Sequence, residues 1–378
     1  MPYYAESSPS LNHVLHYAPI TMPAQQRVQF IQTYILSDIV TCSLSDLRAQ
    51  GVPLETATYL KNQMWPEVAL DLTWANDPAH HLVQYDDALY PPLLKEIRSA
   101  PFLLYAVGDL ALLNSPQIAM VGTRKPTING AKTAKQFAQA LARVGLTVTS
   151  GLALGIDAMS HEGALAEQGR TIAVLGHGMN HRYPRQHVRL FEQIQERGLL
   201  LSEFSPDTGP HARHFPQRNR VISGLSLATL VVEAALKSGS LITARLANEQ
   251  GRDVLAIPGS IHHPQSRGCH ALIKEGAKLI ETVQDILDEL PALFHFQSFS
   301  ASTALTGQEK EQNLDKKLST VLQYVDYDLT SFDAILERSG QPQSVLFSAL
   351  VQLELAGHLV STPLGYTRIS HPVNNNES

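Results

Sequence analysis

From residue 117 to about residue 290, short apolar runs alternate with longer segments of helical periodicity. The runs include QIAMV, LTVTS, TIAVL and LLLS, and segments such as GAKTAKQFAQALARVG separate them. Apolar runs without polar alternation are typical of parallel strands that helices cover on both faces. The sequence therefore predicts an α/β fold built on a doubly wound, Rossmann-like sheet.

The chain before this sheet has a different pattern. Residues 1–80 contain short helical stretches such as SLSDLRAQGV, in which Gly51 is the expected C-cap. This pattern predicts a small helical domain of the SAM or helix-hairpin kind. Such helices occur both in DNA-binding modules and in ordinary helical domains, so the pattern leaves the role of this domain open. The proline-rich segment that follows leads into the sheet, and we assign residues 81–290 to one extended Rossmann-like domain.

Two further segments follow the sheet. Residues 291–315 are rich in Ser, Thr and Gln and predict a linker. Residues 316–372 contain helical stretches, a Gly-Gln-Pro turn and two short strands around Gly365, which is the order of a winged helix. The supposed recognition helix, SVLFSALVQLELAG, has Glu354 as its one charged residue, which favours a protein-binding or regulatory role over DNA reading.

Composition predicts a cytoplasmic protein. The 378 residues are 44% hydrophobic and 17% charged, and the N-terminus has no signal-peptide pattern. No apolar stretch approaches the ~20 residues that a membrane span requires. Cys42 and Cys269 give neither a disulfide framework nor a metal-binding spacing, which fits a reducing compartment.

The basic residues are unevenly placed along the chain. The formal net charge of −6 counts against nucleic-acid binding, but it is only an average. Between residues 182 and 220, four acidic residues are outnumbered by arginines, namely Arg182, Arg185, Arg189, Arg197, Arg213, Arg218 and Arg220. This cluster is either a local nucleic-acid footprint or a solvated helix face.

In open α/β sheets, ligands bind at the carboxyl ends of the strands, so the residues there form the candidate site. After the first run come Gly122, Thr123 and Arg124, in a loop without the glycine spacing of a dinucleotide fingerprint. Arg124 faces a phosphate or, alternatively, pins the loop to a carboxylate. Asp157 and His161, after the second run, are spaced to pair on a helix. No nucleophile or metal accompanies them, which favours a structural role.

Two more strand ends carry candidate residues. In HARHFPQRNR, Phe215 is placed to stack on a base while Arg218 and Arg220 contact phosphates. The alternatives are that Phe215 is a core residue and that one arginine holds a carboxylate, either Glu203 or Glu233. Directly before the next helical pattern stand four residues that bind an anion through free N–H groups or simply cap the helix: Lys237, Ser238, Gly239 and Ser240.

No P-loop, zinc-hydrolase motif, nucleophile elbow or cysteine–histidine cluster is present in the sequence. A catalytic site needs a nucleophile, a base and a group that orients the base, and these residues supply no such set. We therefore expect no cofactor and no metal, and a protein that binds its ligand without catalysis.

At the strand ends the sequence resembles one family. The segments VGTR, SGLALGIDAMSH, Tyr183–Pro184, LLSEF, HFPQRNRVISGLS, VVEAALKSGSLITA and IPGS followed by SRGCHALIKEGA are similar, in order over residues 85–285, to the DNA processing protein A family, also called Smf. Thr123, His270 and Asn180 stand where many members have Ser, Asn and Asp, which affects local loop contacts.

The resemblance implies a dimer that binds single-stranded DNA without sequence preference. It also implies that the protein protects incoming DNA and loads a RecA-type recombinase onto it during natural transformation. Carried over to this chain, the DNA pocket holds Gly122, Thr123, Arg124, Phe215, Arg218, Arg220, Lys237, Ser238, Gly239 and Ser240. The alternative is a nucleotide hydrolase of the phosphoribohydrolase kind, with Glu233 as its base. KSGSLITA does not match the PGG-x-G-T motif of those enzymes, which favours binding.

Overall fold

The computed structural model describes residues 9–19, 24–62, 64–167, 170–290, 316–356, 358–362 and 365–369. By its internal contacts the chain divides into two compact units, residues 1–293 and residues 294–378, and each is described by itself. The predicted linker, residues 291–315, lies outside the described residues.

The first unit is built on a nine-stranded sheet with the strand order β1-β2-β6-β5-β4-β3-β7-β8-β9. The strands from β3 to β9 run parallel, whereas β2 pairs antiparallel with both β1 and β6. The strands are β1 (His80–Gln84), β2 (Leu103–Gly108), β3 (Gln117–Val121), β4 (Thr147–Ser150), β5 (Thr171–Leu175), β6 (Leu199–Ser202), β7 (Ala228–Val231), β8 (Asp253–Ala256) and β9 (Lys278–Leu279). The chain winds outward from β3 to β6 and returns to β7 on the other side of β3, so the predicted doubly wound α/β fold is confirmed.

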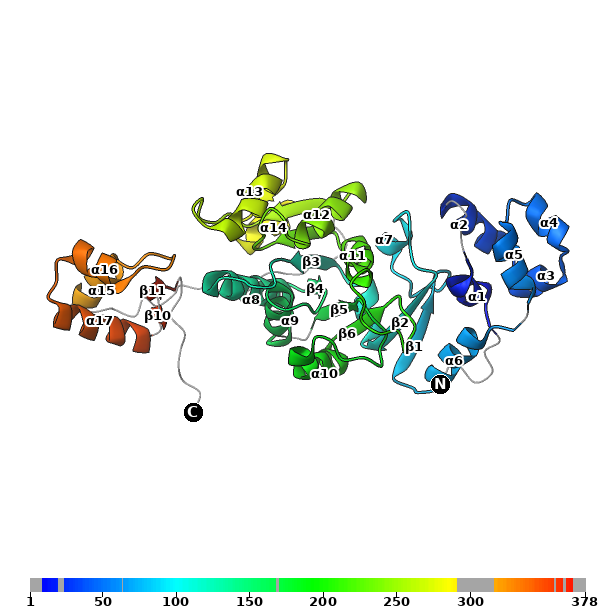
Figure 1. The fold of residues 1–378 in the computed structure, drawn as a ribbon, viewed down its shortest axis with the longest axis horizontal. Helices are drawn as coiled ribbons and strands as arrows, with labels where there is room; N and C mark the ends of the chain where they lie inside the picture. Colours follow the sequence, from blue (N-terminus) through cyan, green and yellow to red (C-terminus); the bar gives the residue numbers. More distant parts are fainter. Residues whose placement is uncertain are drawn as a thin grey trace. The chain divides into compact units, whose positions relative to one another are not determined.

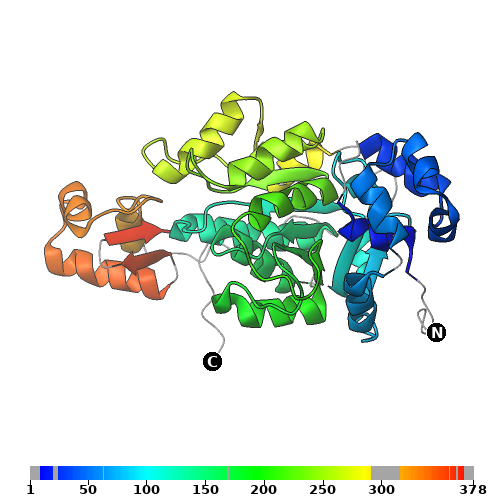
Figure 2. The same cartoon turned by 45° about the vertical axis from the view of Figure 1, so that its right-hand side comes forward.

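Helices cover both faces of this sheet (Figures 1 and 2). One face carries α8 (Ile128–Arg143), α9 (Ile156–Leu165), α10 (Val188–Arg197) and α14 (Val283–Asp288). The other face carries α7 (Pro92–Lys95), α11 (His214–Leu225), α12 (Ser240–Glu249) and α13 (Arg267–Lys274). Short 3₁₀ turns connect some of these elements: η1 (Leu110–Asn114), η2 (Arg185–His187) and η3 (Pro264–Ser266). Because both faces are covered, the central strands are apolar at successive positions, which is the pattern seen in the sequence.

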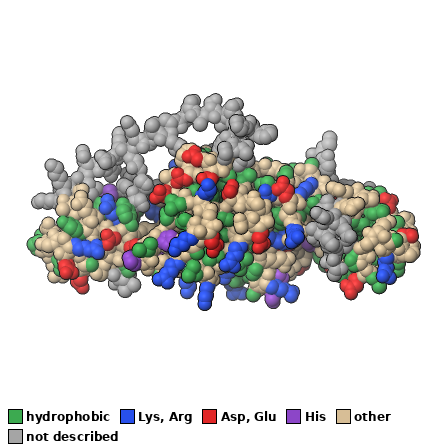
Figure 3. Space-filling model, turned by 90° about the horizontal axis from the view of Figure 1, so that it is seen from above, with side chains coloured by type: hydrophobic (Ala, Val, Ile, Leu, Met, Phe, Trp, Pro, Cys, Tyr) green, Lys and Arg blue, Asp and Glu red, His purple; other side chains and the backbone are tan. Residues whose placement is uncertain are grey.

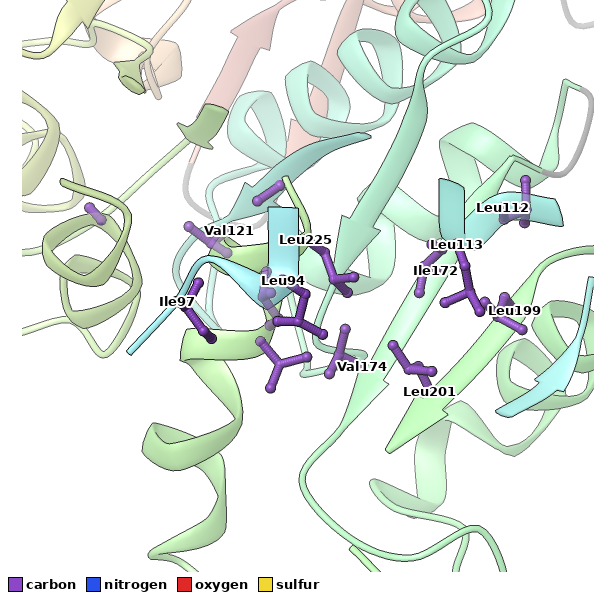
Figure 4. Packing of buried hydrophobic residues seen from close by; sticks show 14 of the residues in the cluster. Leu94, Ile97, Leu112, Leu113, Val121, Ile172, Val174, Leu199, Leu201 and Leu225 are labelled. Atoms are coloured by element: carbon purple, nitrogen blue, oxygen red, sulfur yellow. The ribbon is translucent and has the colours of Figure 1, made fainter. Parts of the chain in front are cut away.

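The core under α11 fixes the helix that carries the arginine-rich motif. Ile172, Val174 and Leu201 of β5 and β6 lie in one buried cluster with Leu225 of α11 and Leu94 of α7 (Figure 4). Each such side chain contributes roughly 1.5–3 kcal/mol when it is fully buried. The first residues of α11 are thereby held at the carboxyl edge of the sheet.

Six short helices precede the sheet. They are α1 (Leu11–Tyr17), α2 (Ala24–Thr33), α3 (Leu36–Thr41), α4 (Leu44–Ala49), α5 (Leu54–Lys61) and α6 (Pro66–Trp74). Gly51 follows α4 with a φ of 83°, the left-handed conformation that glycine supplies at the end of a helix. The buried cluster of these helices includes Phe102, directly before β2, so they pack onto the antiparallel end of the sheet.

The second unit has the predicted winged-helix order of three helices and a hairpin. Its elements are α15 (Lys316–Leu322), α16 (Phe332–Ser339), α17 (Gln343–Leu355), β10 (Leu359–Thr362) and β11 (Gly365–Arg368). β10 and β11 pair antiparallel, with Thr362 opposite Gly365. Val345 and Phe347 of α17 are half exposed, and the described part of this helix has no Lys or Arg.

A histidine is buried between α9 and the sheet. Nδ1 of His161 lies 2.7 Å from the hydroxyl oxygen of Thr171, and its Nε2 accepts the N–H of Leu152 at 3.3 Å. The Thr171 hydroxyl donates onward to the carbonyl of Val148 at 2.8 Å. Burial lowers the pKa of His161 to about 3, so the ring is neutral in the folded protein.

Acid should destabilise the fold through His161. The folded-state pKa of about 3 lies below the ordinary value of 6.5, so the unfolded chain binds more protons and stability falls as the pH falls through 6.5. One such group contributes up to about 1.4 kcal/mol per pH unit in that window. Urea unfolding between pH ~6.5 and ~4.5 should show a shallower pH dependence for His161→Gln. The exposed control His262→Gln should keep the wild-type slope, and equal slopes in all three proteins would contradict this account.

Candidate nucleic-acid interface

A cleft of about 730 Å³ opens at the carboxyl ends of the parallel strands. It lies beside the switch point between β3 and β7, where sheets of this topology bind ligands. The residues that line it come from the loops after β3, β4, β5, β6 and β7, and they include Gly122, Arg124, Ala153, Asp157, Tyr183, Phe215, Arg218, Asn219, Ser238, Gly239 and Ser240. Of the site residues predicted from sequence, Thr123, Arg220 and Lys237 do not line it.

Glu233 joins the loop after β7 to the loop after β3. Its backbone carbonyl accepts the N–H of Thr123 at 2.7 Å. Its carboxylate accepts the N–H of Thr127 at 2.9 Å and also the Thr127 hydroxyl. The carboxylate that would serve as the base of a nucleotide hydrolase therefore joins two strand-end loops and holds Thr127, the N-cap residue of α8.

Arg124 is the exposed cation of the cleft. It has no hydrogen bond or ion pair with any residue in the described ranges, so the alternative in which it pins its loop to a carboxylate is not observed. The loop after β4 packs closely against it, because Gly155 has a φ of 83° and a Cβ there would lie 2.4 Å from the carbonyl oxygen of Thr123. A glycine is needed at this contact, and the guanidinium is left facing the cleft.

Arg218 has a different environment, since only 4% of its surface is exposed. One Nη1 atom donates to the carbonyl of Gly151 at 2.8 Å and also to the carbonyl of Val174. Burial lowers the pKa of Arg218 to about 10, with the nearby Asp157 opposing the shift, so the group stays charged at neutral pH. This guanidinium ties the ends of β4 and β5 to α11 through Nη1, and its Nε donates to the side-chain oxygen of Asn219 at 3.3 Å.

Arg220 points away from the cleft. Its guanidinium pairs with the buried carboxylate of Glu203. The sequence had left open whether one arginine of this segment binds a phosphate or holds Glu203, and Arg220 holds Glu203. Residues two apart on a helix lie about 200° apart around its axis, so Arg218 and Arg220 cannot face the same ligand. Lys237 is exposed next to Ser238, but its side chain is not part of the cleft lining.

Two aromatic side chains form one wall of the cleft. The rings of Tyr183 and Phe215 lie 5.6 Å apart at an interplanar angle of 37°, and Tyr183 is 44% exposed. We call them the aromatic pair. Phe215 was expected here from sequence, whereas Tyr183 was not named as a site residue, although its Tyr-Pro motif belongs to the segments that carry the family resemblance.

The opposite side of the cleft is the N-terminus of α12. Ser238, Gly239 and Ser240 lead into this ten-residue helix, and the hydroxyl oxygens of the two serines lie 2.7 Å apart. A helix N-terminus carries partial positive charge and favours anions. This end of the cleft therefore suits a phosphate, as the sequence predicted.

Asp157 and His161 do not pair. Asp157 is buried, and its Oδ2 accepts the N–H groups of Gly151 at 3.1 Å and Ala153 at 3.4 Å. Burial raises the pKa of this carboxyl, while Arg218 and the backbone donors act in the opposite direction. Because His161 binds Thr171 and Leu152 instead, both residues have the structural role that the sequence favoured.

Charge on the surface is uneven. In the view of Figure 3, Lys and Arg side chains gather along one edge of the middle of the molecule, with histidines among them.

Within the described ranges, no group of three or more His, Cys, Asp or Glu residues is placed to hold a metal ion. No described helix combines the length and the hydropathy needed to cross a membrane.

Two family models match the sequence. The model described as DNA recombination-mediator protein A matches residues 81–291, and the model described as DprA winged helix domain matches residues 307–363. Protein Smf of Escherichia coli K12 is 41% identical over 324 residues, covering 85% of this chain and 86% of that protein. DNA processing protein DprA of Bacillus subtilis is 42% identical over 239 residues, covering 62% of this chain and 80% of that protein.

Two solved structures share the fold. The X-ray structure of DNA processing protein A from Streptococcus pneumoniae has a TM-score of 0.63 at 38% identity, covering 74% of this chain and 97% of that chain. The protein of the same name from Helicobacter pylori, described for its single-stranded DNA binding mode, has a TM-score of 0.52 at 31% identity. It covers 56% of this chain and 96% of its own.

The two arginines of the cleft should differ in their effect on stability. Arg218→Met leaves two buried carbonyls without a donor and Asp157 without a neighbouring cation, so it should cost about 3–5 kcal/mol of unfolding free energy. Arg124→Met changes an exposed side chain and should stay within about 0.5 kcal/mol of the wild type. Urea unfolding of the two variants measures the difference, and equal stabilities would show that Arg218 does not hold the strand ends.

Proposed function

The chain belongs to the DNA recombination-mediator protein A family and so has a role in DNA processing, and from this premise we propose that its cleft binds single-stranded DNA without reading the base sequence. The observation that carries the proposal is the placement around one cleft of Arg124, which has no ion-pair partner in the described ranges, a helix N-terminus and the aromatic pair. The arginine and the helix N-terminus suit the phosphate of an unpaired nucleotide, and the aromatic pair suits its base.

Each side of the cleft suits one part of a nucleotide. Arg124 and the N-terminus of α12 neutralise phosphate oxygens, which are the same in every nucleotide. Tyr183 and Phe215 offer ring faces on which a base stacks, and every base has such a face. In a duplex the base faces are covered by their neighbours, so this arrangement favours single strands. No bond is made or broken in this mechanism.

Arg218 and Arg220 act indirectly in this proposal. Arg218 holds the loops after β4 and β5 in place beneath the ligand, and Arg220 with Glu203 fixes α11 to the antiparallel side of the sheet. Lys237 adds a mobile positive charge at the rim, next to the serines that line the cleft. The phosphate contact is therefore assigned first to Arg124.

We further propose that the protein works in the cytoplasm as a homodimer, protects incoming DNA and loads a RecA-type recombinase onto it during natural transformation. The family assignment and the single-stranded DNA binding described for the Helicobacter pylori relative support this proposal. Its test is recombinase ATPase activity on oligonucleotides coated with single-strand-binding protein. The full chain should shorten the lag, and an unchanged lag would count against loading.

Reversing the charge of Arg124 should abolish tight DNA binding. Arg124→Glu places a carboxylate against phosphate, so affinity for a labelled oligo-dT should fall at least tenfold with the fold intact. The log–log salt slope should drop by ~0.7 for each lost phosphate contact. Fluorescence anisotropy against salt measures both quantities.

Arg143→Glu is the matched control. Arg143 pairs with Glu167 on the surface at the C-terminal end of the 16-residue helix α8, about 24 Å along the helix from its first residue, so the same charge reversal should leave affinity nearly unchanged. If the two variants bound DNA equally well, the assignment of the cleft would be wrong.

Removing residues 316–378 should leave DNA binding largely intact. The described part of the winged helix presents no Lys or Arg on α17, and the cleft is complete within the first unit. The truncated chain should match the full chain in anisotropy titrations with oligo-dT. Loss of most of the affinity would show that the winged helix contacts the DNA.

A further inference from the structure

A buried carboxylate joins the N-terminal helices to the sheet. Asp71 of α6 is 1% exposed, and its Oδ2 accepts hydrogen bonds from three side chains. His13 Nε2 lies at 2.8 Å, the Tyr17 hydroxyl at 2.7 Å and the Tyr105 hydroxyl at 2.6 Å, while the two tyrosine oxygens are 3.0 Å apart. Because His13 and Tyr17 belong to α1 and Tyr105 to β2, one oxygen atom connects three elements, which lie side by side in Figures 1 and 2.

This network is next to β6, and the loops after β5 and β6 lead to the two residues of the aromatic pair. Tyr105 is the register partner of Ser202, the last residue of β6. The Ser202 hydroxyl donates to the carbonyl of His177, in the loop after β5, at 2.8 Å, and accepts the N–H of Phe204 at 3.0 Å. Burial raises the pKa of the Tyr17 hydroxyl, and Ser205, in the loop after β6, acts in the opposite direction.

The loops after β5 and β6 are bonded to each other as well. The N–H of Gly178 donates to the carbonyl of Thr208 at 2.8 Å, and the N–H of Asn180 donates to the carbonyl of Pro206 at 3.0 Å. The first loop continues to Tyr183 and the second leads into α11 at Phe215. The two loops are therefore bonded to each other, and the Ser202 hydroxyl at the end of β6 links them to β2, whose Tyr105 donates to Asp71.

We propose that the N-terminal helices position the aromatic pair of the cleft, with Tyr17 and Asp71 as positioning residues that never touch the DNA. This inference rests on the proposed function, because it assigns a second role to the same site. A carboxylate buried with three donors has one low-energy arrangement, since any displacement leaves a charge without partners. That arrangement fixes Tyr105 of β2 beside Ser202 at the end of β6, and with it the loops that form the wall on which a base stacks.

The test is oligo-dT affinity of the full chain in which single hydroxyl groups are removed. Tyr17→Phe keeps the ring and removes the hydrogen bond to Asp71, and it should weaken binding about fivefold, the effect of one typical hydrogen bond. Ser202→Ala removes the hydroxyl that bonds His177 and Phe204 and should weaken binding in the same direction. The salt slope should stay at the wild-type value in both variants, because no phosphate contact is lost.

Tyr59→Phe is the matched control. Its hydroxyl is buried in the same group of helices and has no hydrogen-bond partner among the described residues, so its removal should leave affinity unchanged. Wild-type affinity in both Tyr17→Phe and Ser202→Ala, with reduced stability alone, would overturn the inference and leave the proposed function in place. Failure of the wild type to bind oligo-dT, or wild-type binding by Arg124→Glu, would instead overturn the proposed function.

Discussion

The guanidinium of Arg218 is the interaction on which the cleft depends. A doubly wound sheet brings the ends of its strands to one edge, but loops that leave toward opposite faces have no reason to stay together. Arg218 reaches from α11 into this edge and donates to carbonyls at the ends of β4 and β5. Glu233 closes the neighbouring gap between the loops after β3 and β7. Buried Arg218 and partly buried Glu233 thus hold the strand-end loops together, and Arg124 projects from this frame without an ion-pair partner among the described residues.

The fold could be predicted from sequence because its signals are local. Buried parallel strands require apolar residues on both faces, and the amphipathic segments between them have one apolar stripe. The location of the site followed from topology, since ligands bind at the strand ends of such sheets whatever their chemistry. These constraints predicted one site for Gly122, Arg124, Phe215 and the Ser238–Ser240 segment, and all of them line the same cleft.

Side-chain partners could not be predicted in the same way. Arg218 and Arg220 are equivalent in sequence, but the phase of α11 turns one toward buried carbonyls and the other toward Glu203. The pairing of Tyr183 with Phe215 depends on two loops that meet only in three dimensions. The same holds for Asp71, whose partners come from three elements. A net charge of −6 likewise gives no information about Arg124, an exposed cation that has no ion pair with any described residue.

The central claim is that unpaired nucleotides occupy the cleft between Arg124 and the aromatic pair. Ultraviolet crosslinking of oligo-dT to the full chain, followed by mass spectrometry of the peptides, tests it most directly. Stacked thymines react with the ring they contact, so the account predicts crosslinks at Tyr183 and Phe215. Crosslinks confined to the winged helix or to the N-terminal helices, with neither aromatic residue modified, would contradict it.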